Sequence, residues 1–335
     1  MALYCGRRFR AKPAAILGLF IALDVLGAAV VAAPEPAIQY PTRTIRIVVP
    51  LPPGGPTDAV ARVLAREMHL GLGQPVVVEN IPGGTGAIAS EAVAKSEPDG
   101  YTLIVAGTAS HALLKVANPK LRYDPLKDFK PIIEYGSYPV GIMVAKAIPA
   151  RDLRELVAVS QRTEGGLLIG VPGTGSVSHV FGLRLAKETG AKLTFVPFRG
   201  DAPARLALLV GSIHGIASTP DFAMIAEGSA RLIGSAGDQR WPQTADVPTF
   251  AEQGFPSLKG LTRWGFAAPA KTPDSVVRVL NEASNEALKA DNVRQVMVNN
   301  AYFVGGGPPQ LFWTNLAHQI AALAEIFEKE SIKLD

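Results

Sequence analysis

Short apolar runs alternate along the chain with longer segments whose apolar residues recur every three or four positions. The run at 45–49 is rich in β-branched residues, which is typical of a strand. The segment 59–69 is predicted to be a helix because apolar residues recur at helical spacing, at Val60, Val63, Leu64 and Met68. Further strands are predicted at 75–80 and 100–106. Strands that alternate with helices predict βαβ units and a parallel sheet covered on both faces.

A loop rich in proline and glycine, at 50–58, connects the first predicted strand to the first predicted helix. Such a loop leaves backbone N–H groups without partners at the start of the helix, where the helix dipole also favours an anion. The loop therefore indicates a site for a carboxylate or a phosphate. The alternative is purely structural: Gly54 and Gly55 only turn the chain, and Thr57 or Asp58 only caps the helix.

The same plan recurs roughly 120 residues later, where a predicted strand at 166–171 leads into a Gly/Thr/Ser loop and a helix. Two such loops predict two α/β domains that each present a helix N-terminus to one shared cleft. We expect the first domain to comprise residues 38–140 and 265–335, and the second to comprise residues 141–264. A predicted strand at 264–269 returns the chain to the first domain, and the segment after it has a helical pattern.

The N-terminal segment has the composition of an export signal. Four basic residues, at positions 7, 8, 10 and 12, precede an apolar run at 14–33 that ends in small residues. This order predicts a signal peptide over residues 1–33 and a periplasmic location. The alternative is a membrane anchor, because the run approaches the length of a span.

The charge balance changes when this leader is set aside. The leader carries four of the 33 basic residues and one of the 29 acidic ones, so the remainder is close to neutral. Neutrality gives no support for a nucleic-acid partner. The single cysteine, Cys5, also lies in the leader, so we expect neither disulfides nor thiolate ligands in the exported protein.

The sequence offers little support for an enzyme. It contains no Gly-x-Ser-x-Gly and no His-Glu-x-x-His pattern, and its five histidines are scattered without metal-ligand spacing. The spacing Gly84-x-Gly86-x-x-Ala89 matches a dinucleotide fingerprint, but the next predicted strand ends without the acidic residue that binds the ribose. We therefore expect no catalytic residues, no cofactor and no metal.

Several motifs occur in an order that resembles one known family. They are Pro53-Gly54-Gly55-x-Thr57-Asp58, the run at 72–80, Pro98-Asp99-Gly100-Tyr101, the run at 123–129, Val196-Pro197-Phe198, Asp246-Val247-Pro248-Thr249 and Gly305-Gly306. Together they resemble the Bug-type solute receptors of tripartite tricarboxylate transporters, over essentially the whole chain after the leader.

The resemblance implies a type II periplasmic-binding fold, in which two α/β domains are hinged by two crossing strands and hold a ligand between them. It implies a small carboxylate ligand that is handed to membrane permease subunits, and we expect a monomer. In the family, loops matching Pro53–Asp58 and Gly173–Ser178 hold one ligand carboxylate through backbone amides and bridging waters. Hinge closure around the ligand is the mechanism that follows.

The predicted ligand-binding residues lie in the two glycine loops and at the ends of other predicted strands. They are Pro53, Gly54, Gly55, Thr57, Asp58, Thr108, Ser110, His111, Thr174, Gly175, Ser176, Ser178, Gly200, Asp201, Ser218 and Thr219. Within this set, Asp58 either ties its own loop together or contacts the ligand through water.

Four positions depart from the family pattern. Leu114 replaces a usual asparagine, Asp201 replaces a small polar residue, and Ser218-Thr219 replaces an Asp-Asn pair. Asp201 is either a helix cap or a group that recognises a donor or cation on the ligand. These changes put the identity of the ligand in doubt, and Leu114 favours a less polar one. A periplasmic sensor that signals through a membrane kinase, or a secreted hydrolase, remains an alternative function.

Overall fold

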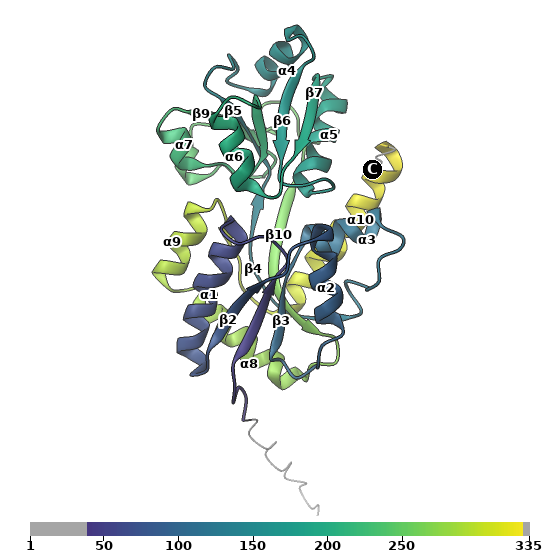
Figure 1. Ribbon diagram of the computed structural model, residues 1–335, viewed down its shortest axis with the longest axis vertical. Helices are drawn as coiled ribbons and strands as arrows, with labels where there is room; N and C mark the ends of the chain where they lie inside the picture. Colours follow the sequence, from purple (N-terminus) through teal and green to yellow (C-terminus); the bar gives the residue numbers. More distant parts are fainter. Residues whose placement is uncertain (1–38, 331–335) are drawn as a thin grey trace, which may run out of the picture. The chain divides into compact units, whose positions relative to one another are not determined.

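The computed structural model describes residues 39–330, so the predicted signal peptide at 1–33 lies outside the described residues. Contacts join the described chain into one unit that contains two β-sheets with helices packed on them (Figure 1). Among the described residues, no helix is both long and apolar enough to cross a membrane.

The first sheet has six strands and is mixed. β1 is parallel to β2 and β3, whereas β10 runs antiparallel to both β3 and β4, and β11 is antiparallel to β4. In spatial order the strands are β11 (Phe303–Val304), β4 (Phe129–Pro139), β10 (Leu261–Pro269), β3 (Thr102–Gly107), β1 (Ile45–Val49) and β2 (Val76–Asn80). The sequence pattern predicted a parallel sheet, and this part of the prediction is wrong because β10 re-enters the sheet in the opposite direction.

Helices cover both faces of this sheet. Ile45 and Ile47 point to the face where Leu64 of the first helix packs, while Val48 points to the opposite face with Phe312. Burying an aliphatic side chain such as Leu64 contributes about 1.5–3 kcal/mol. The first face carries α1 (Pro56–Leu72), α8 (Asp274–Ala287) and α9 (Asp291–Asn299), and the second carries α2 (Ala87–Ala94) and α10 (Pro309–Glu330). The remaining short helical turns are η1 (Gly84–Gly86), η2 (Thr108–Leu113) and α3 (Leu114–Ala117).

The first helix is longer than the sequence pattern predicted. It begins at Pro56, because proline suits a first helical turn, where its missing N–H is not needed. It ends at Leu72, and Gly73 follows in the left-handed conformation with φ 67°. This C-terminal glycine is a common helix stop.

The second sheet has five strands. β6 is parallel to β7 and β8, and β5 is antiparallel to β8 and β9. In spatial order the strands are β7 (Leu193–Pro197), β6 (Leu167–Val171), β8 (Gly215–Ser218), β5 (Gly141–Ala145) and β9 (Ala230–Ser235). The associated helices are α4 (Leu153–Arg162), α5 (Val177–Thr189), α6 (Asp201–Leu209), α7 (Phe222–Ala226) and η3 (Pro242–Thr244). A core that includes Leu153, Leu156, Phe181 and Phe250 packs on this sheet.

The chain passes between the two sheets through neighbouring strands. β4 ends at Pro139 and β5 begins at Gly141, so the first passage is a single residue long. The return strand, β10, pairs with β4 along its full length, from Leu261 opposite Pro139 to Pro269 opposite Phe129. The prediction that a strand near 264–269 returns the chain is therefore confirmed.

Candidate functional site

The first glycine loop leads from β1 into the uncapped N-terminus of α1. Gly54 has φ 86°, in the left-handed region that favours glycine. Gly55 is the N-cap, and no side chain caps the helix there. Pro56 has no N–H, while the amides of Thr57 and Asp58 belong to the first turn, where no intrahelical acceptor exists. This geometry suits an anion because N–H groups and the helix dipole favour negative charge at the same place.

Asp58 holds this loop in shape. Its carboxylate accepts hydrogen bonds from the Gly54 amide at 3.0 Å, from Arg62 Nε at 3.0 Å and from Asn80 Nδ2 at 2.9 Å. Asn80 also donates to the Leu51 carbonyl, which fixes the other end of the loop. Burial alone would raise the pKa of Asp58, but the hydrogen bonds from Arg62, Gly54 and Asn80 outweigh it and lower that pKa. The contacts favour the structural alternative for Asp58, and they also occupy the Gly54 amide.

The second glycine loop repeats this device with a different side chain. The Gly175 amide donates to His179 Nδ1 at 3.1 Å, as Gly54 donates to the residue four positions further on. Ser176 is the N-cap of α5, and its hydroxyl accepts from the His179 amide at 3.1 Å. Since Nδ1 of His179 accepts, the proton of the neutral ring lies on Nε2, and burial lowers the pKa of this side chain. Thr174 is exposed, so it lies on the open side of the loop.

Residues 108–111 lie where α5 contacts the short turn η2. Thr108 Oγ1 accepts from the Arg263 amide at 2.8 Å and donates to Gln319 at 2.7 Å, which links η2 to β10 and α10. Ser110 Oγ lies 2.9 Å from His111 Nδ1. Thr108, Ser110 and His111 are buried, and each forms a hydrogen bond to another protein group, although His111 Nε2 has no partner among the described residues.

His111 belongs to the core in this structure. Its ring is fully buried and packs against Tyr123, Phe129 and Trp313. Burial lowers the pKa of His111 to about 3, so the ring is neutral at physiological pH. The sequence placed this residue at a strand end, but η2 turns it inward, and any contact with a ligand remains a prediction.

The second sheet contributes Gly200, Asp201, Ser218 and Thr219. Asp201 is the first residue of α6 and is partly buried, and Ser218 Oγ at the end of β8 donates to its Oδ1. Burial raises the pKa of Asp201. Ser218 and Thr219 are 4% and 2% exposed, so both side chains at the end of β8 are buried.

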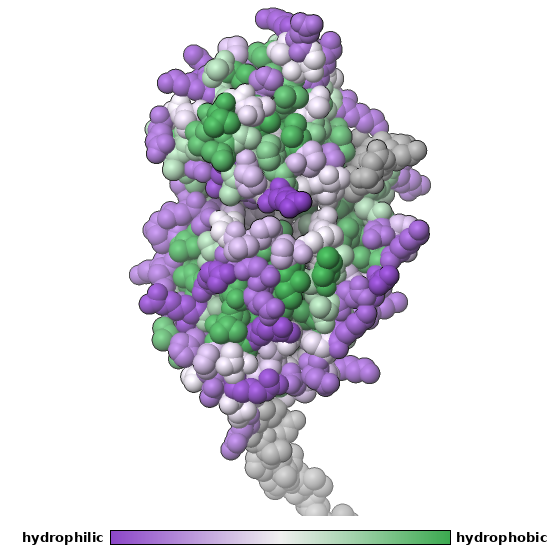
Figure 2. Space-filling view, in the orientation of Figure 1, coloured by the Kyte–Doolittle hydropathy of each residue, from purple (hydrophilic) through white to green (hydrophobic). Residues whose placement is uncertain are grey.

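Two tyrosines lie beside the first glycine loop, and no local sequence pattern predicts either of them. Tyr302 lies with its hydroxyl 3.1 Å from Thr57 Oγ1, and its ring meets that of Tyr138 at 4.9 Å between centroids. Burial raises the pKa of both hydroxyls, and the negative charge of Asp201 adds to this increase. Ser218, which contacts Asp201, pairs with Gly141 three residues after Tyr138, so Asp201 lies in the same region as the two tyrosines and the first glycine loop. Figure 2 shows a hollow on this face of the molecule, between the parts that contain the two sheets.

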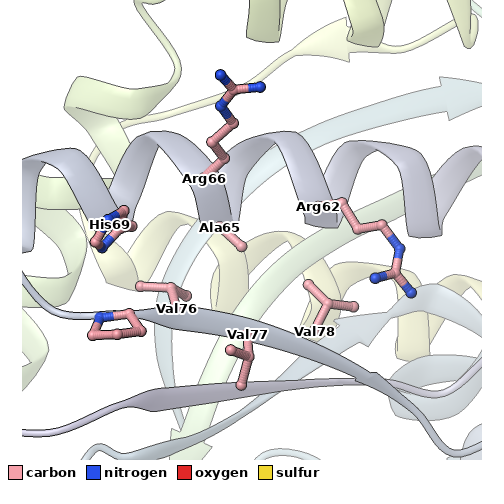
Figure 3. A pocket seen from close by; sticks show the side chains of 8 residues that line it. Arg62, Ala65, Arg66, His69, Val76, Val77 and Val78 are labelled. Carbon is pink, nitrogen blue, oxygen red and sulfur yellow. The ribbon is translucent and has the colours of Figure 1, made fainter.

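Of the cavities that lie outside the glycine loops, two border elements of the first sheet. One, of about 680 Å³, is bordered by β10, α5 and α10, and Thr108 is the only predicted site residue in its lining. The other, of about 540 Å³, lies between α1 and β2. Figure 3 shows Arg62, Arg66 and His69 of α1 above this strand, with Val76 and Val78 turned toward the helix. Among the described residues, no group of three or more histidine or acidic side chains is arranged to hold a metal ion.

Comparisons with known proteins agree on one family. Residues 60–328 match the tripartite tricarboxylate transporter family receptor. BugT of Bordetella pertussis is 34% identical over 282 residues, which cover 83% of this chain and 85% of BugT.

Solved structures give the same result. MatC of Rhodopseudomonas palustris with bound malate is 33% identical, with a TM-score of 0.79, and the match covers 86% of this chain and 99% of MatC. Rpa4515 of the same organism with adipate is 30% identical, with a TM-score of 0.81, over 88% and 99% of the two chains. The predicted two-domain α/β fold of a periplasmic binding protein is therefore confirmed, and the chain belongs to the family of tripartite tricarboxylate transporter receptors.

Proposed function

We propose that this protein is a periplasmic receptor that captures a small carboxylate between its two domains and delivers it to the permease subunits of a tripartite transporter. The observation that carries this proposal is the uncapped N-terminus of α1, next to a loop whose shape is fixed by Asp58. Relatives that bind malate and adipate support a carboxylate as the ligand.

The amides of Thr57 and Asp58 and those at the start of α5 are the groups we propose to hold the ligand carboxylate. A hydrogen bond from an N–H group to a charged acceptor contributes about 1.5–3 kcal/mol. A helix N-terminus adds roughly 0.3–1 kcal/mol. Four such bonds therefore account for the roughly 8 kcal/mol of a micromolar affinity without a cationic side chain.

Hinge bending is the proposed mechanism. The domains, residues 38–140 with 265–335 and residues 141–264, would rotate about Val140 and the start of β10 at Leu261. Both passages lie side by side, which supports a single bending axis. Ligand bound to the first glycine loop would then recruit the second loop, and closure would exclude water from the carboxylate.

The remaining parts of the proposal concern location and partners. The basic and apolar N-terminal segment supports export, and the family's name supports a membrane permease as the partner. We propose that the protein acts as a monomer, binds no nucleic acid and performs no catalysis, since its relatives are binding proteins.

A binding screen tests this function. Purified protein without the leader is titrated calorimetrically with mono- and dicarboxylates of three to six carbons, and each mixture is then analysed for reaction products. We expect micromolar binding of at least one carboxylate, compaction in small-angle scattering and no product. At a hundredfold excess over Kd, the ligand should stabilise the protein by about 2.7 kcal/mol. Conversion of the ligand, or the failure of every carboxylate to bind, would overturn the proposal.

A further inference from the structure

Asp201 begins α6, and its carboxylate does not cap that helix. The N-cap position of this helix belongs to Gly200, which has no side chain. Instead, Oδ1 accepts a hydrogen bond from Ser218 on β8. The carboxylate is therefore turned toward the end of the second sheet.

The charge of Asp201 lacks an ion-pair partner. Arg205, one turn along α6, forms its ion pair with Asp221 at 3.2 Å. Within the described residues, no lysine or arginine lies within ion-pair distance of Asp201, although the charge of Arg205 acts on it from further away. A partly buried carboxylate loses hydration, and an ion pair with a cation would compensate for that loss.

The residue that follows Ser218 carries a buried hydroxyl without a hydrogen-bond partner among the described residues. Thr219, next to Ser218, is 2% exposed, and its hydroxyl has no hydrogen-bond partner among the described residues. A buried hydroxyl without a partner is costly, so its position indicates a ligand or water that completes its hydrogen bonding. Thr219 and the free oxygen of Asp201 together offer acceptors to a donor.

The predicted ligand-binding residues supply no lysine or arginine for a second ligand carboxylate. The sixteen predicted site residues include two aspartates and neither lysine nor arginine. The charge of Asp58 is balanced by Arg62, which leaves Asp201 as the uncompensated charge. Ser218, which contacts Asp201, pairs with Gly141 just after β4, and Tyr138 of β4 packs on Tyr302 beside Thr57 of the first glycine loop. A dicarboxylate would therefore bring its second charge toward a like charge, which is unfavourable.

We propose that Asp201 selects ligands that carry a protonated amine in addition to the carboxylate held by the glycine loops. This inference rests on the proposed function and specifies its ligand class. The amine donates to Asp201 and to the Thr219 hydroxyl, while the ligand carboxylate accepts from the amides of the loops. A dicarboxylate of the same length lacks this donor and meets the repulsion of Asp201.

The test compares ligands that differ only at one end. Linear acids of four to six carbons, with a terminal amine, hydroxyl or carboxylate, are titrated calorimetrically into the wild type at pH 7.5. The same series is applied to Asp201→Asn and Asp201→Ser. Asp238→Asn is the matched control, because it removes one negative charge from an exposed site where Asp238 pairs with Lys259. Circular dichroism verifies that each variant is folded.

We expect the wild type to bind the amino acid at least tenfold more tightly than the dicarboxylate of the same length. Both Asp201 variants should lose at least tenfold in affinity for the amino ligand and should bind the dicarboxylate as well as, or better than, the wild type. Asp238→Asn should keep the wild-type ratio.

Three outcomes would overturn the inference. The first is a wild type that prefers the dicarboxylate, and the second is an Asp201 variant with an unchanged ratio. The third is a hydroxy acid that binds as tightly as the amino acid, which would replace charge recognition by simple hydrogen bonding. In each of these three outcomes the protein still binds a carboxylate, so the proposed function stands. A wild type that binds no acid of any kind refutes the proposed function and the inference together.

Discussion

Replacing Asp58 by asparagine tests whether the first glycine loop depends on one carboxylate. In the native structure Oδ2 accepts from the Gly54 amide and Arg62 Nε, while Oδ1 accepts from Asn80 and lies 3.0 Å from Arg62 Nη2. An asparagine at this position keeps one acceptor oxygen and places an NH2 group where the other oxygen was. That NH2 group would then face the donors of Asn80 and Arg62.

The expected cost follows from these contacts. Losing the hydrogen bond from Asn80 to a buried charged acceptor costs about 1.5–3 kcal/mol. Arg62 is about half exposed, so the loss of its ion pair adds at most about 1 kcal/mol. We therefore expect Asp58→Asn to lower the free energy of unfolding by about 2–3 kcal/mol. A less ordered loop should also weaken carboxylate binding about tenfold, which corresponds to about 1.4 kcal/mol.

Urea unfolding and calorimetry measure the two effects. Because the native pKa of Asp58 is lowered, its contribution to stability is present above the unfolded pKa and is lost as the pH falls through the native pKa. The variant should therefore show a shallower loss of stability below about pH 4. Glu79→Gln is the matched control, since it removes an exposed carboxylate paired with Arg46 and should change stability by less than about 0.5 kcal/mol. Equal stability and affinity in Asp58→Asn and the wild type would refute the reasoning.

Three further predictions concern the surroundings of the site. Ser176→Ala removes the cap of α5 and should cost about 1 kcal/mol in urea unfolding, and an unchanged midpoint would contradict the cap. Gly107→Ala should destabilise the protein by about 1–3 kcal/mol because the new Cβ would lie 2.4 Å from the Trp264 ring, whereas Gly71→Ala, in open space on α1, should be neutral or stabilising. His111→Gln should remove a loss of stability that develops as the pH falls from about 6.5 toward 3, since the buried ring binds no proton there while the unfolded chain does. Unfolding free energies measured at several pH values check this, and equal slopes for both proteins would disprove it.

The parts of the fold that follow local patterns could be predicted from the sequence. The β-branched run at 45–49 is β1, and the repeated strand–loop–helix plan at 166–179 corresponds to β6 and α5. Both signals are local, because the hydrophobic periodicity of a strand or an amphipathic helix involves only neighbouring residues. The direction of β10 was not predictable in this way, since pairing between strands more than a hundred residues apart leaves no periodic signal.

The two glycine loops could be predicted from the sequence, whereas the contacts around them could not. Glycines before a helix carry a physical meaning of their own, which is why Gly54 and Gly175 were found. The contact of Thr57 with Tyr302 joins residues 245 positions apart, and no local sequence pattern around either residue predicts it. The contact of His179 with the Gly175 amide could have been predicted, because His179 follows Gly175 at the same spacing as Asp58 follows Gly54.

Because β4 pairs with β10 along its full length, residues 140–260 form an insertion between two neighbouring strands of the first sheet. Leu261 lies directly opposite Pro139, so the segment between them leaves and rejoins the sheet at adjacent points. A tight hairpin turn of two to five residues could join these points. Related receptors could therefore exchange this segment as a single genetic block while the six-stranded sheet keeps its hydrogen bonding. Such an exchange would replace the second sheet and its helices, including Asp201, and leave the first glycine loop unchanged.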